Sequence, residues 1–97
     1  MEYTTKIVCI EKYSAIEEAV YLINDTKFGL QCGVFTNLIS EVDYCFDNIE
    51  TGGVIINDVP TFRVDQMPYG GIKDSGLGRE GVKYAMLDML EPKLLVM

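Results

Sequence analysis

Six residues near the carboxyl end of the sequence match a pattern that holds phosphate in dinucleotide-binding folds. Residues 76–81 read Gly-Leu-Gly-Arg-Glu-Gly, the G-x-G-x-x-G form. In such a fold the turn directly follows a strand and precedes an acidic residue by about 20 positions. Here a polar stretch, residues 72–75, precedes the pattern, and the acidic position would fall beyond residue 97. We therefore predict that these glycines let the loop approach other backbone and enter a helix at unusual φ/ψ angles, and that no residue of this chain binds a cofactor.

The candidate nucleophiles are three cysteines, Cys9, Cys32 and Cys45, in a sequence without histidine. A serine or cysteine nucleophile needs an adjacent base, so the absence of histidine excludes the usual Ser–His and Cys–His pairs. Cys9 lies in an apolar run and Cys45 on an apolar helix stripe, where burial raises the pKa of a thiol and suppresses its reactivity. We expect all three to be reduced packing residues, and we predict no catalytic residue in this chain.

A metal site is not expected either. The cysteines form no C-x-x-C pair, and without histidine they do not complete a zinc site. The other potential ligands are carboxylates along one predicted helix, and the simplest interpretation of such a set is a solvated helix face. We predict no metal ligand among them: Glu41, Asp43, Asp47 and Glu50.

Binding chemistry is expected in the long loop at residues 58–78, because long loops rich in glycine and proline are usually functional or poorly ordered. This loop carries an aromatic residue beside a cation, Phe62 and Arg63, which a hydrophobic core does not need. A guanidinium suits a substrate with a carboxylate or phosphate, because it can donate two parallel hydrogen bonds. In the alternative interpretation, Arg63 forms a surface ion pair with Asp65 or Asp58.

The composition is that of an ordinary globular protein. The 97 residues are 48% hydrophobic and 24% charged, and we expect one domain over residues 1–97. The net charge of −7, from 15 acidic and 8 basic residues, argues against nucleic acid or an anionic membrane as a partner. No apolar run approaches the ~20 residues needed to cross a bilayer. We expect a cytoplasmic location.

Three apolar runs are predicted to form strands, at residues 6–10, 32–36 and 54–57. Between them, apolar residues recur at helical spacing in two segments: Ile16, Ala19, Val20 and Ile23 in the first, and Val42, Cys45, Phe46 and Ile49 in the second. Ser14 and Glu17 have the spacing of a capping box for the first helix. Short connections in this β-α-β-α-β order predict a small, mainly parallel sheet, so the expected fold class is α/β.

A third helix and a last strand are predicted after the glycine- and proline-rich loop. Val82, Ala85, Met86 and Met89 repeat the helical spacing until Pro92, which cannot donate a backbone hydrogen bond, ends the helix. Residues 93–97 have the pattern of a C-terminal strand. No ordinary helical crossover returns this strand to the parallel sheet, so we expect that it can pair elsewhere, including with another chain.

The segment 67–81 resembles the closing motif of the aldehyde dehydrogenase superfamily. It reads Met-Pro-Tyr-Gly-Gly-Ile-Lys-Asp-Ser-Gly-Leu-Gly-Arg-Glu-Gly, and the resemblance continues through residues 18–20, 23–26, 28–36, 53–57 and 91–93. It implies that the chain is a C-terminal fragment of the catalytic domain. The nucleophilic cysteine, the general-base glutamate and the dinucleotide-binding fold of that family lie upstream of the matched region.

The resemblance also implies where an aldehyde would enter. In the family, the loop after the third strand lines this entrance, close to the aromatic residue of a Pro-aromatic-Gly-Gly motif. That role carries over to Tyr69, and with it to Phe62 and Arg63 as entrance candidates. Of the family's Glu-x-Phe-Gly-Pro run, which touches the nicotinamide riboside, only Glu2 matches. The segments 57–65 and 67–71 are similar to the branch that acts on small hydroxylated, phosphorylated or semialdehyde substrates.

Two functional hypotheses follow. In the first, the chain is a truncated or split aldehyde dehydrogenase, whose parent family oxidises an aldehyde to a carboxylic acid with NAD or NADP. It would be inactive alone, would bind no cofactor alone, and would associate with itself or with a missing upstream dehydrogenase half. In the alternative, it is a non-catalytic interaction or oligomerisation module, or a gene remnant, whose terminal strand binds another subunit.

Overall fold

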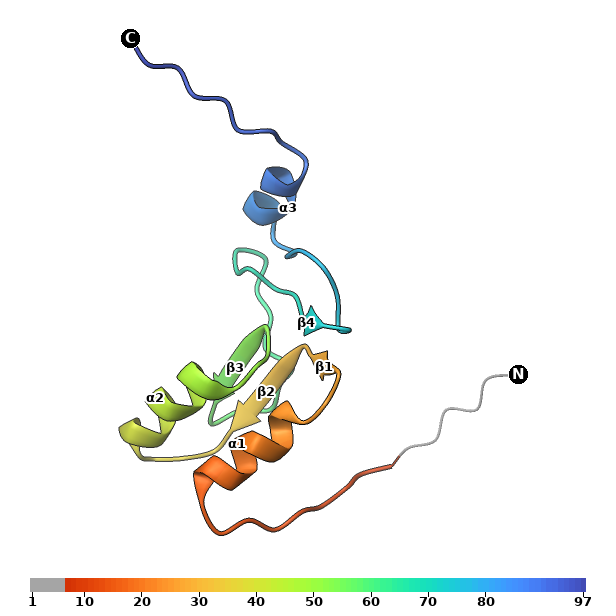
Figure 1. Ribbon diagram of the computed structural model, residues 1–97, viewed down its shortest axis with the longest axis vertical. Coiled ribbons are helices and arrows are strands. Elements are labelled where there is room, and N and C mark those ends of the chain that lie inside the picture. The colour runs from red at the N-terminus through yellow and green to blue at the C-terminus, as the bar shows by residue number, and fades with distance from the viewer. Residues whose placement is uncertain (1–6) are drawn as a thin grey trace, which may run out of the picture.

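The computed structural model describes residues 7–97 (Figure 1). The predicted contact at Glu2 and the first residue of the first expected strand, Lys6, lie outside these residues. Two helices, α1 (Ile16–Asn24) and α2 (Ile39–Asn48), lie beside the parallel strands β2 (Gln31–Val34) and β3 (Gly53–Ile56). These four elements match the central part of the predicted order.

The parallel pair β2–β3 and both helices share one small core. The register pairs Gln31 with Gly53 and Val34 with Ile56. Alternate residues of each strand point to the same face of a sheet. The face that carries Val34 and Ile56 packs against the apolar stripes of α1 and α2. The buried residues are Val20, Val34, Cys45 and Ile49, with Ile16, Ile23, Cys32, Tyr44, Val54 and Ile56 packed around them.

A second, separate sheet corrects the prediction of one mainly parallel sheet. Strand β1 (Phe28–Gly29) pairs antiparallel with β4 (Ile72–Lys73), with Phe28 opposite Lys73 and Gly29 opposite Ile72. Each of these strands has two residues, too few to show an alternating apolar pattern in the sequence. The α/β class is confirmed, but the described residues form one parallel and one antiparallel pair.

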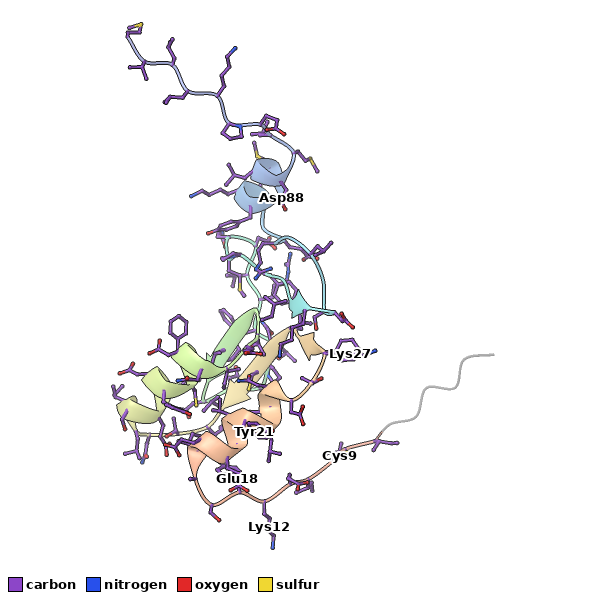
Figure 2. All side chains as sticks on the ribbon, in the orientation of Figure 1. Cys9, Lys12, Glu18, Tyr21, Lys27 and Asp88 are labelled. Atoms are coloured by element: carbon purple, nitrogen blue, oxygen red, sulfur yellow. The ribbon has the colours of Figure 1, made fainter. Side chains whose placement is uncertain are left out.

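The predicted strands at both ends of the chain are wrong. Residues 7–10 form no strand, and Ile7, Val8 and Ile10 are 73%, 87% and 88% exposed. Residues 93–97 also form no strand, and Leu94 to Met97 are at least 80% exposed. Residues 7–10 and 93–97 extend away from the rest of the described chain (Figures 1 and 2). A strand needs a neighbour for its backbone hydrogen bonds, and no described strand pairs with either segment.

The start of α1 differs in detail from the predicted capping box. Ala15 is the residue that caps the helix, and no side chain completes the cap. The Ser14 backbone N–H donates instead to the Glu18 Oε2 atom at 3.0 Å. A glutamate of the first helical turn therefore accepts a hydrogen bond from the backbone before the helix, as in a capping box, but this glutamate is Glu18 and not Glu17.

The third helix, α3 (Val82–Asp88), is shorter than predicted: its last residue is Asp88 and its C-cap is Met89, before Pro92. None of its residues is buried. The radius of gyration is 17.0 Å, whereas a compact chain of this length has about 12.5 Å. The surface area is 8419 Å², against about 5,600 Å² for a compact monomer of this mass. Much apolar surface is therefore left open. Within residues 7–97, no helix is both long and apolar enough to cross a membrane.

Candidate functional site

The loop that carries the entrance candidates starts at the carboxyl end of the parallel strands. Asn57 follows β3 in the left-handed region, with φ of 59°, which asparagine tolerates better than most residues. Its N–H donates to the Val34 carbonyl at 2.7 Å, and its Oδ1 atom accepts from the Thr36 N–H at 2.9 Å. Asn57 thus ties the ends of β2 and β3 together, and the loop then passes close to β2, where a Cβ atom on Gly33 would lie 2.6 Å from the Asp58 carbonyl oxygen.

The structure brings two of the three entrance candidates together. The Arg63 guanidinium lies 5.7 Å from the centre of the Tyr69 ring, within the range of a cation–π contact. It also pairs with Asp65 at 3.0 Å and with Glu80 at 3.3 Å. Backbone hydrogen bonds between Tyr69 and Glu80 hold the two sides of this cluster. The predicted alternative of an Arg63–Asp65 pair is therefore present. Asp58 instead accepts a hydrogen bond from the Val59 backbone N–H at 2.7 Å.

The third candidate, Phe62, is held by a residue that the sequence did not single out. The Phe62 side chain is half-exposed, and the Phe62 carbonyl accepts a hydrogen bond from the Gln31 Nε2 atom at 3.0 Å. Gln31 is the first residue of β2, so the sheet itself positions the loop. Its buried Oε1 atom has no hydrogen-bond partner among the described residues. In the sequence, only the polar side chain of Gln31, directly before an apolar run, could have indicated this contact.

The Arg63 ion pairs are solvent-exposed and therefore weak. The side chains of Arg63, Asp65 and Glu80 are 42%, 85% and 65% exposed, and exposed pairs contribute about 0–1 kcal/mol. A carboxylate or phosphate in a ligand could replace either partner at little cost, because the guanidinium has five N–H donors. The guanidinium can thus bind an anionic group, while the two carboxylates of the cluster are engaged with Arg63.

The glycine pattern at residues 76–81 serves the close packing that we predicted. A Cβ atom on Gly81 would lie 2.6 Å from the Met67 carbonyl oxygen, and one on Gly70 would lie 2.7 Å from the Gly78 carbonyl oxygen. Only Gly76 has open space around it, with no atom within 4 Å of an added Cβ atom. Gly81 has φ of 99° and leads directly into α3. The Arg79 guanidinium donates to the carbonyls of Gly71 and Gly78.

A negative charge faces the same pattern. The Asp88 carboxylate, on α3 (Figure 2), would lie 2.8 Å from a Cβ atom on Gly78. This carboxylate repels a phosphate at the position where a dinucleotide turn would hold it. The geometry therefore favours a structural role for these glycines.

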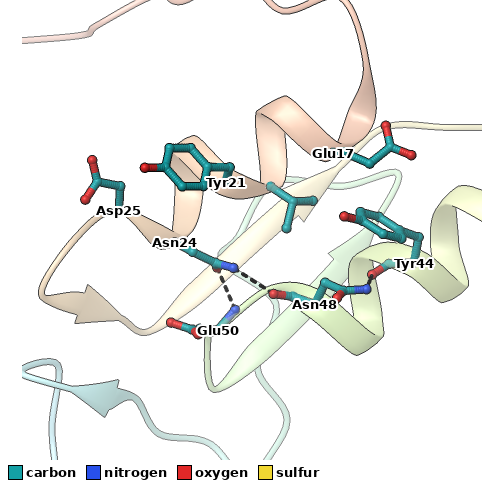
Figure 3. A pocket seen from close by; sticks show the side chains of 8 residues that line it. Glu17, Tyr21, Asn24, Asp25, Tyr44, Asn48 and Glu50 are labelled. Carbon is teal, nitrogen blue, oxygen red and sulfur yellow. Dashed lines mark hydrogen bonds between the residues drawn. The ribbon is translucent and has the colours of Figure 1, made fainter.

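A pocket lies between the carboxyl ends of α1 and α2, away from the Arg63 cluster (Figure 3). The Asn24 side chain spans it: Nδ2 donates to the Asn48 carbonyl at 2.7 Å, and Oδ1 accepts from the Glu50 N–H at 2.8 Å. From the second sheet, the Lys73 ammonium pairs with Glu50 at 2.7 Å and donates to the Asn24 and Thr26 carbonyls. This junction anchors the glycine-rich segment to both helices.

The acidic residues around this junction do not form a metal centre. Within residues 7–97, no three histidine, cysteine or carboxylate side chains are grouped closely enough to hold a metal ion. Glu50, one of the carboxylates weighed from the sequence, is paired with Lys73.

The three thiols differ in environment. Cys45 is fully buried, and burial raises its pKa, with the nearby Glu41 carboxylate adding to the shift. Cys32 is half-buried, and burial first and then Cys45 raise its pKa. The predicted burial of Cys9 is wrong, because the segment 7–10 is exposed (Figure 2).

Comparison with known proteins identifies the relatives of this chain. The model of the aldehyde dehydrogenase family matches residues 2–95. Lactaldehyde dehydrogenase of Methanococcus maripaludis is 51% identical over 90 residues, which cover 93% of this chain and 19% of that protein. A 3-sulfolactaldehyde dehydrogenase of Priestia aryabhattai is 46% identical over the same shares of the two chains.

Solved structures agree with this assignment. Aldehyde dehydrogenase 21 of Physcomitrella patens, in complex with the reaction product succinate, superposes with a TM-score of 0.82 at 59% identity. The match covers 88% of this chain and 18% of that one. Glyceraldehyde-3-phosphate dehydrogenase of Methanocaldococcus jannaschii, complexed with NADP, gives a TM-score of 0.73 at 53% identity, covering 75% of this chain and 16% of that one. The chain belongs to the aldehyde dehydrogenase family and matches a short portion of its members.

Proposed function

We propose that this chain forms the aldehyde-entrance side of a dehydrogenase active site and does not oxidise aldehydes alone. The observation that carries the proposal is the Arg63–Tyr69–Glu80 cluster, on the loop that Gln31 holds at the amino end of β2, in a chain that spans 19% of its lactaldehyde dehydrogenase relative. The nucleophilic cysteine, the general base and the cofactor site would come from another polypeptide segment. Residues 1–97 act as one unit in this proposal, in the cytoplasm.

The proposed substrate class is small aldehydes that carry an anionic group. Arg63 supports this class, because its guanidinium lies at the surface and its present carboxylate partners are exposed. Two relatives point the same way, since one is a 3-sulfolactaldehyde dehydrogenase and another was solved with the reaction product succinate. Tyr69 and Phe62 would contact the carbon chain of the aldehyde.

The proposed cofactor is NAD or NADP, bound by the complementary segment and not by this chain alone. Solved relatives hold NADP in one case and NAD in another. The Asp88 carboxylate beside Gly78 supports the absence of a phosphate site in this chain.

A second function, as an interaction module, is favoured by the open surface of α3. None of its residues is buried, and the whole chain exposes far more area than a compact monomer of its mass. This function does not exclude the first, because a chain that completes an active site must also bind its partner.

A chimera tests the entrance proposal. The matching segment of the Methanococcus maripaludis lactaldehyde dehydrogenase is replaced by this chain, and NAD(P)H formation is followed with aldehydes that carry or lack an anionic group. We expect an active chimera in which Arg63→Gln raises KM for the anionic aldehydes by about tenfold, the effect of losing one charged hydrogen-bonded contact. Lys12→Gln, on the extended amino-terminal segment, is the control. A folded chimera whose preference ignores Arg63 would contradict the role of the cluster.

A further inference from the structure

The entrance loop crosses the face of β2 that carries Gln31. Gln31 and Gly33 alternate along the strand, so both point to this face. A Cβ atom on Gly33 would lie 3.2 Å from the Pro60 Cδ atom, so the loop passes directly over this glycine. On the neighbouring strand, a Cβ atom on Gly53 would lie 3.3 Å from the Gln31 Cγ atom. The two glycines therefore leave room for the loop and for the Gln31 side chain.

The Gln31 amide makes the one hydrogen bond that joins loop residues 61–66 to the described strands. Its Nε2 atom donates to the Phe62 carbonyl at 3.0 Å. The other hydrogen bonds of residues 61–66 stay within residues 59–67 or reach Glu80. The ion pairs of Arg63 are exposed, and exposed pairs hold a loop only weakly. The position of this loop relative to the sheet therefore depends on Gln31.

The contact acts on Arg63 through the backbone. The Phe62 carbonyl and the Arg63 N–H belong to one planar peptide group. A hydrogen bond that fixes the direction of this carbonyl therefore also fixes where the Arg63 side chain begins. From that point the guanidinium lies 5.7 Å from the centre of the Tyr69 ring and 3.3 Å from the Glu80 carboxylate. Without the hydrogen bond, the guanidinium would lose its fixed position beside Tyr69.

The other end of the same amide shows that packing alone does not explain a glutamine here. The Gln31 Oε1 atom is buried and has no hydrogen-bond partner within residues 7–97. A buried acceptor without a partner destabilises a fold. Turning the amide over would bring Oε1 against the Phe62 carbonyl, where two acceptors repel each other. A methionine has a similar shape and no buried amide oxygen, so what the glutamine adds is the N–H donor for Phe62.

We propose that Gln31 is a positioning residue that sets the preference of the entrance for anionic aldehydes. Gln31 does not contact the aldehyde. It holds Arg63 where the guanidinium meets the anionic group of an aldehyde that enters past Tyr69. A fixed guanidinium binds this group without first losing conformational freedom, which lowers KM. The inference rests on the proposed function, because it assumes that the Arg63 cluster faces the entering aldehyde.

Kinetics of the active chimera test this preference with two aldehydes that differ by one sulfonate, lactaldehyde and 3-sulfolactaldehyde. Gln31→Met should raise KM for 3-sulfolactaldehyde by about fivefold, the effect of one lost hydrogen bond, and should leave kcat and the KM for lactaldehyde unchanged. With Arg63→Gln already present, Gln31→Met should have no further effect, because no guanidinium remains to be positioned. Gln66→Met, at an exposed glutamine of the same loop, is the control. An equal loss with both aldehydes, or a loss that persists beside Arg63→Gln, would overturn the proposal.

Trypsin cleavage of the isolated chain separates this inference from the proposed function. Cleavage after Arg63 reports how often the loop opens. Gln31→Met should speed this cleavage by about fivefold, again the effect of one hydrogen bond. Cleavage after Lys12, on the extended amino-terminal segment, should keep its rate, and the urea midpoint should not fall, because the unpaired acceptor is removed together with the donor. An unchanged rate at Arg63 would overturn the role of Gln31 even if the chimera behaves as proposed. A faster rate beside a chimera that ignores Arg63→Gln would contradict the proposed function and, through it, the anionic preference.

Discussion

Replacement of Asn24 by alanine should weaken the junction between α1 and α2 by a measurable amount. The side chain makes two hydrogen bonds, to the Asn48 carbonyl at 2.7 Å and from the Glu50 N–H at 2.8 Å (Figure 3). Each such bond contributes about 0.5–1.5 kcal/mol net. Asn24 is half-exposed, so water can partly replace the lost partners. We expect the free energy of unfolding to fall by about 1–2 kcal/mol.

Urea unfolding followed by far-UV circular dichroism measures this loss. With a slope of about 1.5 kcal/mol per molar urea, a loss of about 1.5 kcal/mol lowers the unfolding midpoint by about 1 M. Asn37→Ala is the matched control, because Asn37 is exposed and its side chain makes no hydrogen bond within residues 7–97. An Asn24→Ala midpoint that stays as close to wild type as the control midpoint would refute the bridging role of Asn24.

Further predictions concern the thiols and the lysine of the same junction. In the native protein a thiol reagent should label Cys9 quickly, Cys32 slowly and Cys45 only after unfolding. Mass spectrometry of the labelled peptides measures the three rates. Fast labelling of Cys45 would contradict its burial. Because burial raises the pKa of Cys32 and Cys45 in the folded state, their contribution to stability is complete below the ordinary thiol pKa of about 8.5 and is lost as the pH rises above it. Denaturation midpoints across this pH range test that sign. Lys73→Met should speed hydrogen exchange at the Asp74 amide, which lies in the segment that Lys73 anchors, and an unchanged rate would argue against the anchor.

The central helices and strands could be predicted because they pack against one another within the chain. Val20 on α1, Val34 on β2 and Cys45 on α2 lie on apolar stripes with the expected periods, and all three are buried in the same core. Their spacing in the sequence follows the period of the helix or strand whose apolar side packs in that core.

The two terminal strands could not be predicted correctly from apolar pattern alone. Residues 7–10 and 93–97 have the composition of buried strands, but a strand exists only where another supplies its hydrogen bonds. The pattern indicates an apolar preference, and among residues 7–97 no strand pairs with either segment. Short β1 and β4 show the reverse case, since their pairing depends on the junction at Lys73 and not on periodicity.

The candidate site was only partly visible in the sequence. Composition of the loop drew attention to Phe62 and Arg63, and the family resemblance to Tyr69. Their partners Gln31 and Glu80 come from 31 and 17 residues away, and no local pattern links positions so far apart. The loop geometry depends on the fold, which sets the distance between β2 and the glycine-rich segment.

Calorimetric titration of NAD and of NADP into the isolated chain tests the central claim most directly. If the chain supplies only the entrance side of a dehydrogenase, neither cofactor should give saturable heat, because the Asp88 carboxylate faces the only G-x-G-x-x-G turn of the sequence. A saturable, stoichiometric heat at micromolar cofactor would contradict the account and would identify residues 76–81 as a phosphate-binding turn.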